Sequence, residues 1–102
     1  MIKFSYQKNE VNYKLKVIGH ASNNHGQDII CSSVSTAIIV SINLIEELKL
    51  SSKINYTLSD GYFNLEVVEN DYVIIGVLNN LIYTLEDLSS QYPKRFRKEI
   101  WC

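Results

Sequence analysis

The chain has 102 residues, of which 46% are hydrophobic and 21% are charged, a size and balance that fit one globular domain spanning residues 1–102. Its formal net charge of -1 excludes a protein whose overall field attracts nucleic acid or acidic surfaces. With one proline and four glycines, the composition also excludes a flexible linker or a collagen-like repeat.

The cysteines and the apolar stretches indicate where the protein works. Cys31 and Cys102 lie far apart in the sequence, and no signal-peptide pattern precedes them, so we expect two reduced thiols in a cytoplasmic protein. The longest apolar stretch, residues 37–45, is interrupted by Ser41 and Asn43. We therefore expect no membrane-spanning segment and no membrane partner.

The first half of the chain predicts a hairpin followed by a helix. Apolar and polar residues alternate over 2–8 and 11–18, which is the period of half-buried strands. Residues 19–27 have no periodicity and contain two glycines, so they predict a loop. Asp28 is a typical helix N-cap, and apolar residues at intervals of three and four predict a helix that runs to about Leu48.

The second half repeats this order. Alternation over 53–59 and 62–68, with Asp60-Gly61 between the two segments, predicts a second hairpin. The next apolar stripe predicts a helix that begins after Asn70 or Asp71 and ends before Pro93.

A last strand is predicted from Arg95 to Trp101, which completes the order ββαββαβ. This order predicts an α+β fold, a two-layer sandwich in which two helices pack on a mainly antiparallel sheet. The first helix is apolar beyond one face, at Ile39, Val40 and Leu44. These three residues fit either a homodimer interface or burial beneath the second helix.

One group of residues carries possible chemistry. With Asp28 as the cap, Cys31 falls in the first helical turn, where unpaired N–H groups and the helix dipole favour thiolate over thiol. His20, at the end of the second strand, could reach that turn and act as the base of a Cys–His pair. Ser35 lies one turn after Cys31, on the same helix face.

From spacing alone, other interpretations stay open. A free cysteine is more often a buried core residue than a nucleophile. His20, His25 and Cys31 offer at most three good ligands without the paired spacing of a zinc site, so we expect neither a metal nor a cofactor. His25, between Asn24 and Gly26, is more often a solvated loop histidine than a base, but its position also fits a role shared with His20.

A longer pattern is more specific than the Cys–His spacing. The chain resembles the ribosomal-processing cysteine protease family called Prp, and the likeness runs nearly end to end. It is carried by Gly19-His20-Ala21, Gly26-x-Asp28-Ile29-Ile30-Cys31, Val34-Ser35, Asp60-Gly61 and Tyr92-Pro93.

The resemblance implies a homodimeric α+β cysteine endopeptidase that removes a short N-terminal extension from ribosomal protein twenty-seven of the large subunit. It implies Cys31 as nucleophile and His20 as general base, with Asp28 and Ser35 at positions that support the active site. Gly19, Ala21 and Gly26 belong to the same motif, and residues 21–27 match a mobile segment that orders over bound substrate.

The sequence departs from the family pattern at two places. Ser32-Ser33 stands where small apolar residues are usual, and Thr84-Leu85 stands where a glycine often sits. Neither departure touches the Cys–His pair, but both bear on pocket shape and substrate preference.

The segment Lys94 to Lys98 holds four of the ten basic residues around Phe96. Such a segment can contact RNA phosphates, but it is more often the solvated face of an edge strand, so we do not expect direct RNA contact. The alternative function is therefore a catalytically silent, ribosome- or RNA-associated binding domain. A thiol redox protein is disfavoured, because no cysteine lies near Cys31 to resolve a disulfide.

Overall fold

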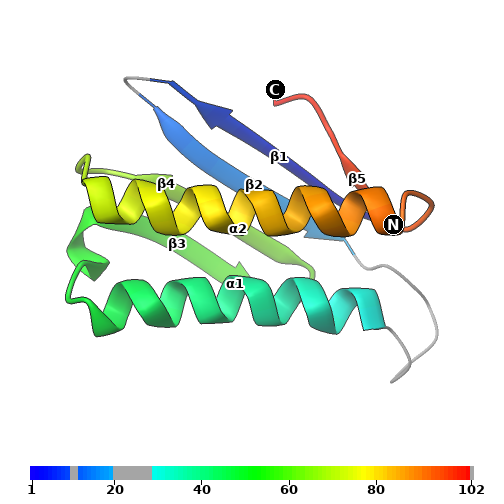
Figure 1. Cartoon of the computed structure of the whole chain (residues 1–102), viewed down its shortest axis with the longest axis horizontal. Helices are drawn as coiled ribbons and strands as arrows, with labels where there is room; N and C mark the ends of the chain where they lie inside the picture. Colours follow the sequence, from blue (N-terminus) through cyan, green and yellow to red (C-terminus); the bar gives the residue numbers. More distant parts are fainter. Residues whose placement is uncertain (10–11, 20–28, 102) are drawn as a thin grey trace.

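The computed structural model describes residues 1–9, 12–19 and 29–101. Two helices lie side by side on one face of a five-stranded sheet (Figure 1). This arrangement confirms the predicted two-layer α+β fold and its order. The elements are β1 (Ile2–Lys8), β2 (Tyr13–Gly19), α1 (Ile29–Glu47), the 3-10 turn η1 (Ser51–Lys53), β3 (Ile54–Ser59), β4 (Tyr62–Val67), α2 (Tyr72–Gln91) and β5 (Phe96–Lys98).

The sheet has the order β3-β4-β2-β1-β5. The pairs β3–β4, β4–β2 and β2–β1 are antiparallel, whereas β5 runs parallel to β1. Side chains that alternate on these strands fill the space beneath the helices, and Leu15 and Leu65 are completely buried there. The sheet, α1 and α2 thus share one hydrophobic core.

The last strand is shorter than predicted, because it ends at Lys98 rather than at Trp101. Phe96 is buried against Phe4, with ring centroids 4.9 Å apart, and this contact holds β5 to β1. The amide of Glu99 still donates to the carbonyl of Phe4 at 2.7 Å. Beyond it the chain leaves the sheet edge, and the Trp101 ring lies 4.9 Å from the ammonium of Lys16 on β2, an aromatic–cation contact.

Helix α1 buries one stripe, formed by Ile30, Val34, Ile38, Ser41, Ile42 and Ile45. By length and mean hydropathy α1 could also cross a membrane, a test that the core helix of a soluble protein passes as well. It ends at Glu47, and Lys49, two residues later, has a φ of 63°, the left-handed conformation that often closes a helix. The amide of Leu50 donates to the carbonyl of Ile45 at 3.0 Å and completes this end.

Three apolar residues of α1 stay outside the core. Ile39, Val40 and Leu44 are 45%, 59% and 45% exposed. Burial beneath α2 is therefore the wrong interpretation of their pattern, because other residues of α1 form the stripe that enters the core.

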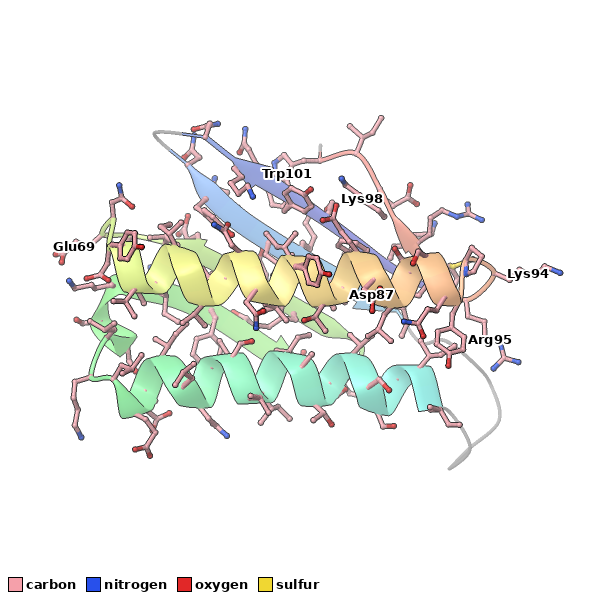
Figure 2. All side chains as sticks on the ribbon, in the orientation of Figure 1. Glu69, Asp87, Lys94, Arg95, Lys98 and Trp101 are labelled. Atoms are coloured by element: carbon pink, nitrogen blue, oxygen red, sulfur yellow. The ribbon has the colours of Figure 1, made fainter. Side chains whose placement is uncertain are left out.

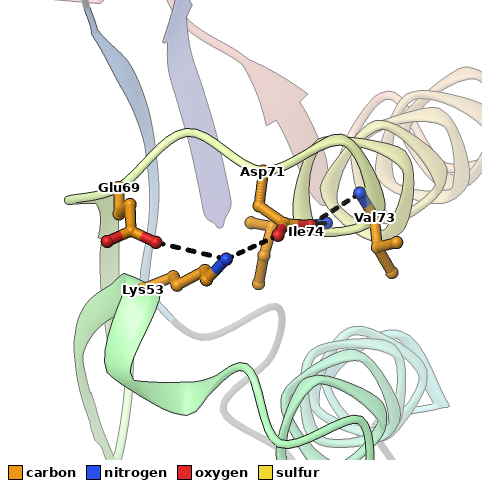
Figure 3. Close-up of polar contacts among 5 residues, drawn as sticks. All are labelled: Lys53, Glu69, Asp71, Val73 and Ile74. Atoms are coloured by element: carbon orange, nitrogen blue, oxygen red, sulfur yellow. Dashed lines mark hydrogen bonds and ion pairs between the residues drawn. The ribbon is translucent and has the colours of Figure 1, made fainter.

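Helix α2 begins after Asp71, which decides between the two predicted caps. The Asp71 carboxylate accepts hydrogen bonds from the amides of Val73 and Ile74, at 2.8 Å and 3.3 Å (Figure 3). It also accepts one from Lys53 Nζ at 2.7 Å, and the same ammonium lies 3.2 Å from Glu69. The cap therefore joins α2 to the turn before β3. The Lys53 hydrogen bond, followed by those of the helix amides, holds the pKa of the Asp71 carboxyl below its ordinary value.

We predict that Asp71→Ala lowers the melting temperature by about 4–8 °C, because a lost N-cap has this effect in a small domain. Asp71→Asn keeps a capping side chain and should lower the melting temperature less. Because the pKa is lowered on folding, ionised Asp71 stabilises the fold at pH values above the unfolded pKa of about 3.9. This contribution disappears as the pH falls through the folded pKa. Melting curves between pH 3 and 7 measure both effects. An alanine variant as stable as the parent at neutral pH would contradict them.

Candidate active site

Three elements that are distant in the sequence meet around a small cavity of about 70 Å³. It lies between the first turns of α1, the end of β2 and the β3–β4 hairpin. Its lining includes Gly19, Cys31 and Ser35 together with hairpin residues 58–63. The fold thus brings together the three predicted site residues that the described part of the chain contains.

Cys31 is the third residue of α1 and is half-buried. It is not in a disulfide. Cys31 thus lies in the first turn of α1, at the positive end of the helix dipole, and lines the cavity. This placement gives the sulfur access to a peptide that enters the cavity.

The two serines after Cys31 have other partners. Ser33 Oγ donates to the carbonyl oxygen of Ile29 at 2.7 Å, and Ser32 Oγ donates to the same oxygen at 3.2 Å. Both hydroxyls therefore bond to the main chain of their own helix. Ser35, one turn after Cys31, is the serine of α1 that lines the cavity.

Gly19 is required by its surroundings. Its φ of 107° is rarely adopted by other residues, and an added Cβ would collide with the carbonyl oxygen of Met1. Its amide donates to the carbonyl of Gly61 at 2.9 Å, which ties the end of β2 to the β3–β4 turn. Because His20 follows directly in the sequence, Gly19 fixes the position of the main chain immediately before the histidine.

The β3–β4 turn is a part of the site that the sequence indicated only as a hairpin. Asp60 and Gly61 line the cavity opposite Cys31 and Ser35. The Asp-Gly pair predicted the turn, but the position of the turn beside the cavity depends on the pairing of Ile18 with Tyr62 between β2 and β4. This pairing joins distant strands and cannot be derived from a local pattern.

Several predicted site residues lie outside the described residues. They are His20, Ala21, Gly26 and Asp28, together with His25 and the terminal Cys102. The Cys–His pair and the Asp28 cap therefore stay predictions. Within residues 1–9, 12–19 and 29–101, no three His, Cys, Asp or Glu side chains gather as metal ligands would.

The comparison with known families decides which enzyme class this cavity belongs to. The family model described as cysteine protease Prp matches residues 1–97. The chain belongs to the cysteine protease Prp family. It is thus a cysteine-type peptidase, and Cys31, the cysteine within the described residues, lines the cavity.

Solved structures with the same fold include Prp proteins. A ribosomal processing protease Prp from S. aureus, in complex with a covalently linked product peptide, has 23% identity and a TM-score of 0.83, over 99% of this chain and 100% of that one. The same S. aureus protease with a substrate peptide has 22% identity and a TM-score of 0.82, with the same coverage. SMU.848 from Streptococcus mutans has 20% identity and a TM-score of 0.74, over 98% and 93% of the two chains. No curated protein sequence matches the chain.

No basic side chain of the segment 94–98 lines the cavity of this Prp-family chain. Lys94 and Arg95 extend outward from the end of α2 (Figure 2). Lys98 is engaged, since its Nζ donates to Glu86 at 3.1 Å and to the Tyr6 hydroxyl at 2.9 Å. Burial raises the pKa of Glu86, but the hydrogen bonds from Lys98 and Tyr6 outweigh it and hold that pKa below its ordinary value. Lys98 therefore fastens the edge strand to α2.

Proposed function

We propose that this Prp-family peptidase removes the N-terminal extension of ribosomal protein twenty-seven of the large subunit, in the cytoplasm, with Cys31 as nucleophile and His20 as general base. The observation that carries the proposal is the cavity at which Cys31, at the start of α1, meets Gly19, the residue before His20. The S. aureus structures of the same fold hold a substrate peptide and a covalently linked product peptide. A peptide substrate for this chain agrees with both.

The proposed mechanism has two halves. In the first, His20 takes the proton of the Cys31 thiol, the thiolate attacks the scissile carbonyl carbon, and His20 then gives the proton to the leaving amine as the C–N bond breaks. In the second, water attacks the thioester with His20 as base, which releases the carboxylate product and restores the thiol. The first-turn amides of α1 stabilise the oxyanion that forms in each half.

The remaining motif residues take supporting roles in the proposal. Gly19 fixes the departure of the chain toward His20, and Asp28 caps α1 ahead of Cys31. Ser35 lines the same cavity as Cys31, and in this proposal its hydroxyl donates a hydrogen bond to the thiol or to the substrate. Ala21 and Gly26 belong to the segment that orders over bound peptide.

The substrate is tested by mass spectrometry of the organism's own ribosomal protein twenty-seven after incubation with the chain. Loss of an N-terminal extension is expected, and the mass difference locates the cleavage site. If a substrate that carries the extension stays intact, the chain acts on another peptide or serves as a catalytically silent binding domain, and the proposal for this substrate is wrong.

We also propose that the protein is a homodimer whose interface includes Val40 and Leu44. Both residues line a groove of about 610 Å³ between α1 and α2, with Val73, Gly76 and Val77 on its other side. The exposed apolar side chains in this groove are the kind of surface that association covers.

A charge in this groove should weaken the dimer. We expect Leu44→Lys to raise the dimer dissociation constant by about tenfold or more, because the ammonium would be desolvated in an apolar interface. Asn43→Lys places the same charge on an exposed position of the same helix and should have little effect. Sedimentation equilibrium measures both. A parent chain that sediments as a monomer, or equal effects of the two variants, would reject this interface.

A further inference from the structure

Strand β3 is an edge of the sheet and lacks the features that usually protect an edge. It pairs with β4 on one side, and no described strand lies on its other side. Its sequence, Ile54 to Ser59, contains no charged residue and no proline, and residues 55–59 are exposed. Exposed edges normally carry lysines, prolines or bulges that prevent another chain from pairing with them. An unprotected edge of this kind is a template for a further strand.

The register shows which groups β3 offers. The amide of Val68 donates to the carbonyl of Lys53 at 2.8 Å. Because hydrogen-bonded pairs alternate in an antiparallel ladder, Asn55, Thr57 and Ser59 direct their main-chain groups toward β4. Tyr56 and Leu58 therefore direct their N–H and C=O groups toward the open edge.

The same two residues place their side chains on the helix side of the sheet. Tyr56 is paired with Leu65 and Leu58 with Phe63, and both partners are buried in the core. Tyr56 and Leu58 nevertheless remain 45% and 44% exposed, because they lie at the rim of the sheet. The open edge of β3 thus has apolar side chains beside its available hydrogen-bonding groups.

This edge leads to the candidate active site. Leu58 and Ser59, at the end of β3, line the same cavity as Cys31 and Ser35. Along α1, Cys31, Ser35 and Ile39 are spaced four residues apart and lie along one side of the helix. Helix α1 and strand β3 run in opposite directions (Figure 1), and the cavity joins the first turns of α1 to the end of β3.

We propose that the peptide substrate binds as an additional strand on the open edge of β3, which carries its scissile bond to Cys31. Its main chain pairs with the N–H and C=O groups of Tyr56 and Leu58. Alternate side chains of the peptide pack against Tyr56, Leu58 and Ile39, so the site selects an extended peptide with apolar residues at alternating positions. The inference rests on the proposed function, which supplies the peptide. It adds how the peptide binds and which residues select its side chains.

Amide hydrogen exchange tests this binding mode directly. The probe is a synthetic peptide that spans the N-terminal extension and first mature residues of the organism's ribosomal protein twenty-seven, added to the full chain carrying Cys31→Ala so that it is not cleaved. Without peptide, the amides of Tyr56 and Leu58 should exchange fast. At saturation both should slow by about tenfold or more, while Thr57, already bonded to β4, should not change. Unchanged exchange at Tyr56 and Leu58 with bound peptide overturns the inference.

Two variants separate the main-chain bond from the side chain. Tyr56→Ala removes only the ring, whereas Tyr56→Pro removes the ring and the outward N–H, which takes no part in the β4 ladder. The proline variant should bind the peptide about fivefold more weakly than the alanine variant, the effect of one net hydrogen bond. Equal affinities reject main-chain pairing. If the proline variant does not fold, N-methylation of single peptide amides gives the same test, with losses expected at every second position.

The design distinguishes this inference from the proposed function. If the ribosomal peptide does not bind, the proposed substrate is wrong, and the exchange experiment is run on a peptide selected from a random library against the same variant. Protection of Tyr56 and Leu58 by that peptide supports the edge as the binding site, and no protection rejects it. Concentration-dependent protection without any peptide would show that a second copy of the chain covers β3, which also overturns the inference.

Discussion

Cys31→Ala should reduce peptide cleavage to the rate of the blank, because no other described residue at the cavity carries a thiol. His20→Ala should reduce the rate by about 10²–10⁴-fold, the usual contribution of a general base. Cleavage of a synthetic N-terminal peptide of ribosomal protein twenty-seven, followed by mass spectrometry, measures both. Under the proposed mechanism, the two changes together cost little more than the first alone.

Cys102→Ser provides the matched control, since it removes the other cysteine of the chain and should leave the rate unchanged. Each variant should keep the melting temperature of the parent within a few degrees, which excludes unfolding as the cause of lost activity. Cleavage by Cys31→Ala at the parent rate would exclude Cys31 as the nucleophile.

Gly19→Ala should destabilise the chain by about 2–5 kcal/mol, since strain at a positive φ adds to a steric collision. The collision is with the Met1 carbonyl oxygen, which belongs to the backbone at the start of β1. Relief of the contact would shift β1 against β2 and move the main chain at position 19, directly before His20. Activity should therefore fall along with stability, as measured by denaturant unfolding and by peptide cleavage.

Gly76→Ala is the matched control for this change. Gly76 lies inside α2 and lines the groove between α1 and α2, so both glycine variants are compared in the Leu44→Lys background, where the proposed dimer is weakened. An added Cβ at Gly76 meets nothing within 4 Å of its own chain. Alanine is preferred over glycine in a helix interior, so we expect a gain of about 0.5–1 kcal/mol. If Gly19→Ala were as harmless as Gly76→Ala, the close approach of β2 to Met1 would be wrong.

Local patterns were sufficient to predict most of the fold. Alternation and the Asp60-Gly61 turn identified both hairpins, and the apolar stripes identified both helices to within a residue or two of their ends. The last strand was overextended, because Trp101 contacts Lys16 instead of continuing the ladder. The parallel pairing of β5 with β1 was not readable, since it joins residues from opposite ends of the chain.

The candidate site was only partly predictable. The motif around His20 and Cys31 indicated the chemistry, and Gly19, Cys31 and Ser35 do meet at one cavity. The contribution of the β3–β4 turn and the open edge at Tyr56 and Leu58 depends on strand order. Strand order results from packing of the whole domain, which no local pattern contains.

The most direct test of the central claim, that Cys31 is an activated nucleophile, is its rate of alkylation. Iodoacetamide is added to the native chain near neutral pH, and peptide mass spectrometry follows the labelling of Cys31 and Cys102 separately. We expect that Cys31 is labelled faster than Cys102, and that His20→Ala slows the labelling of Cys31 alone. Equal labelling of the two cysteines, unaffected by His20→Ala, would contradict it.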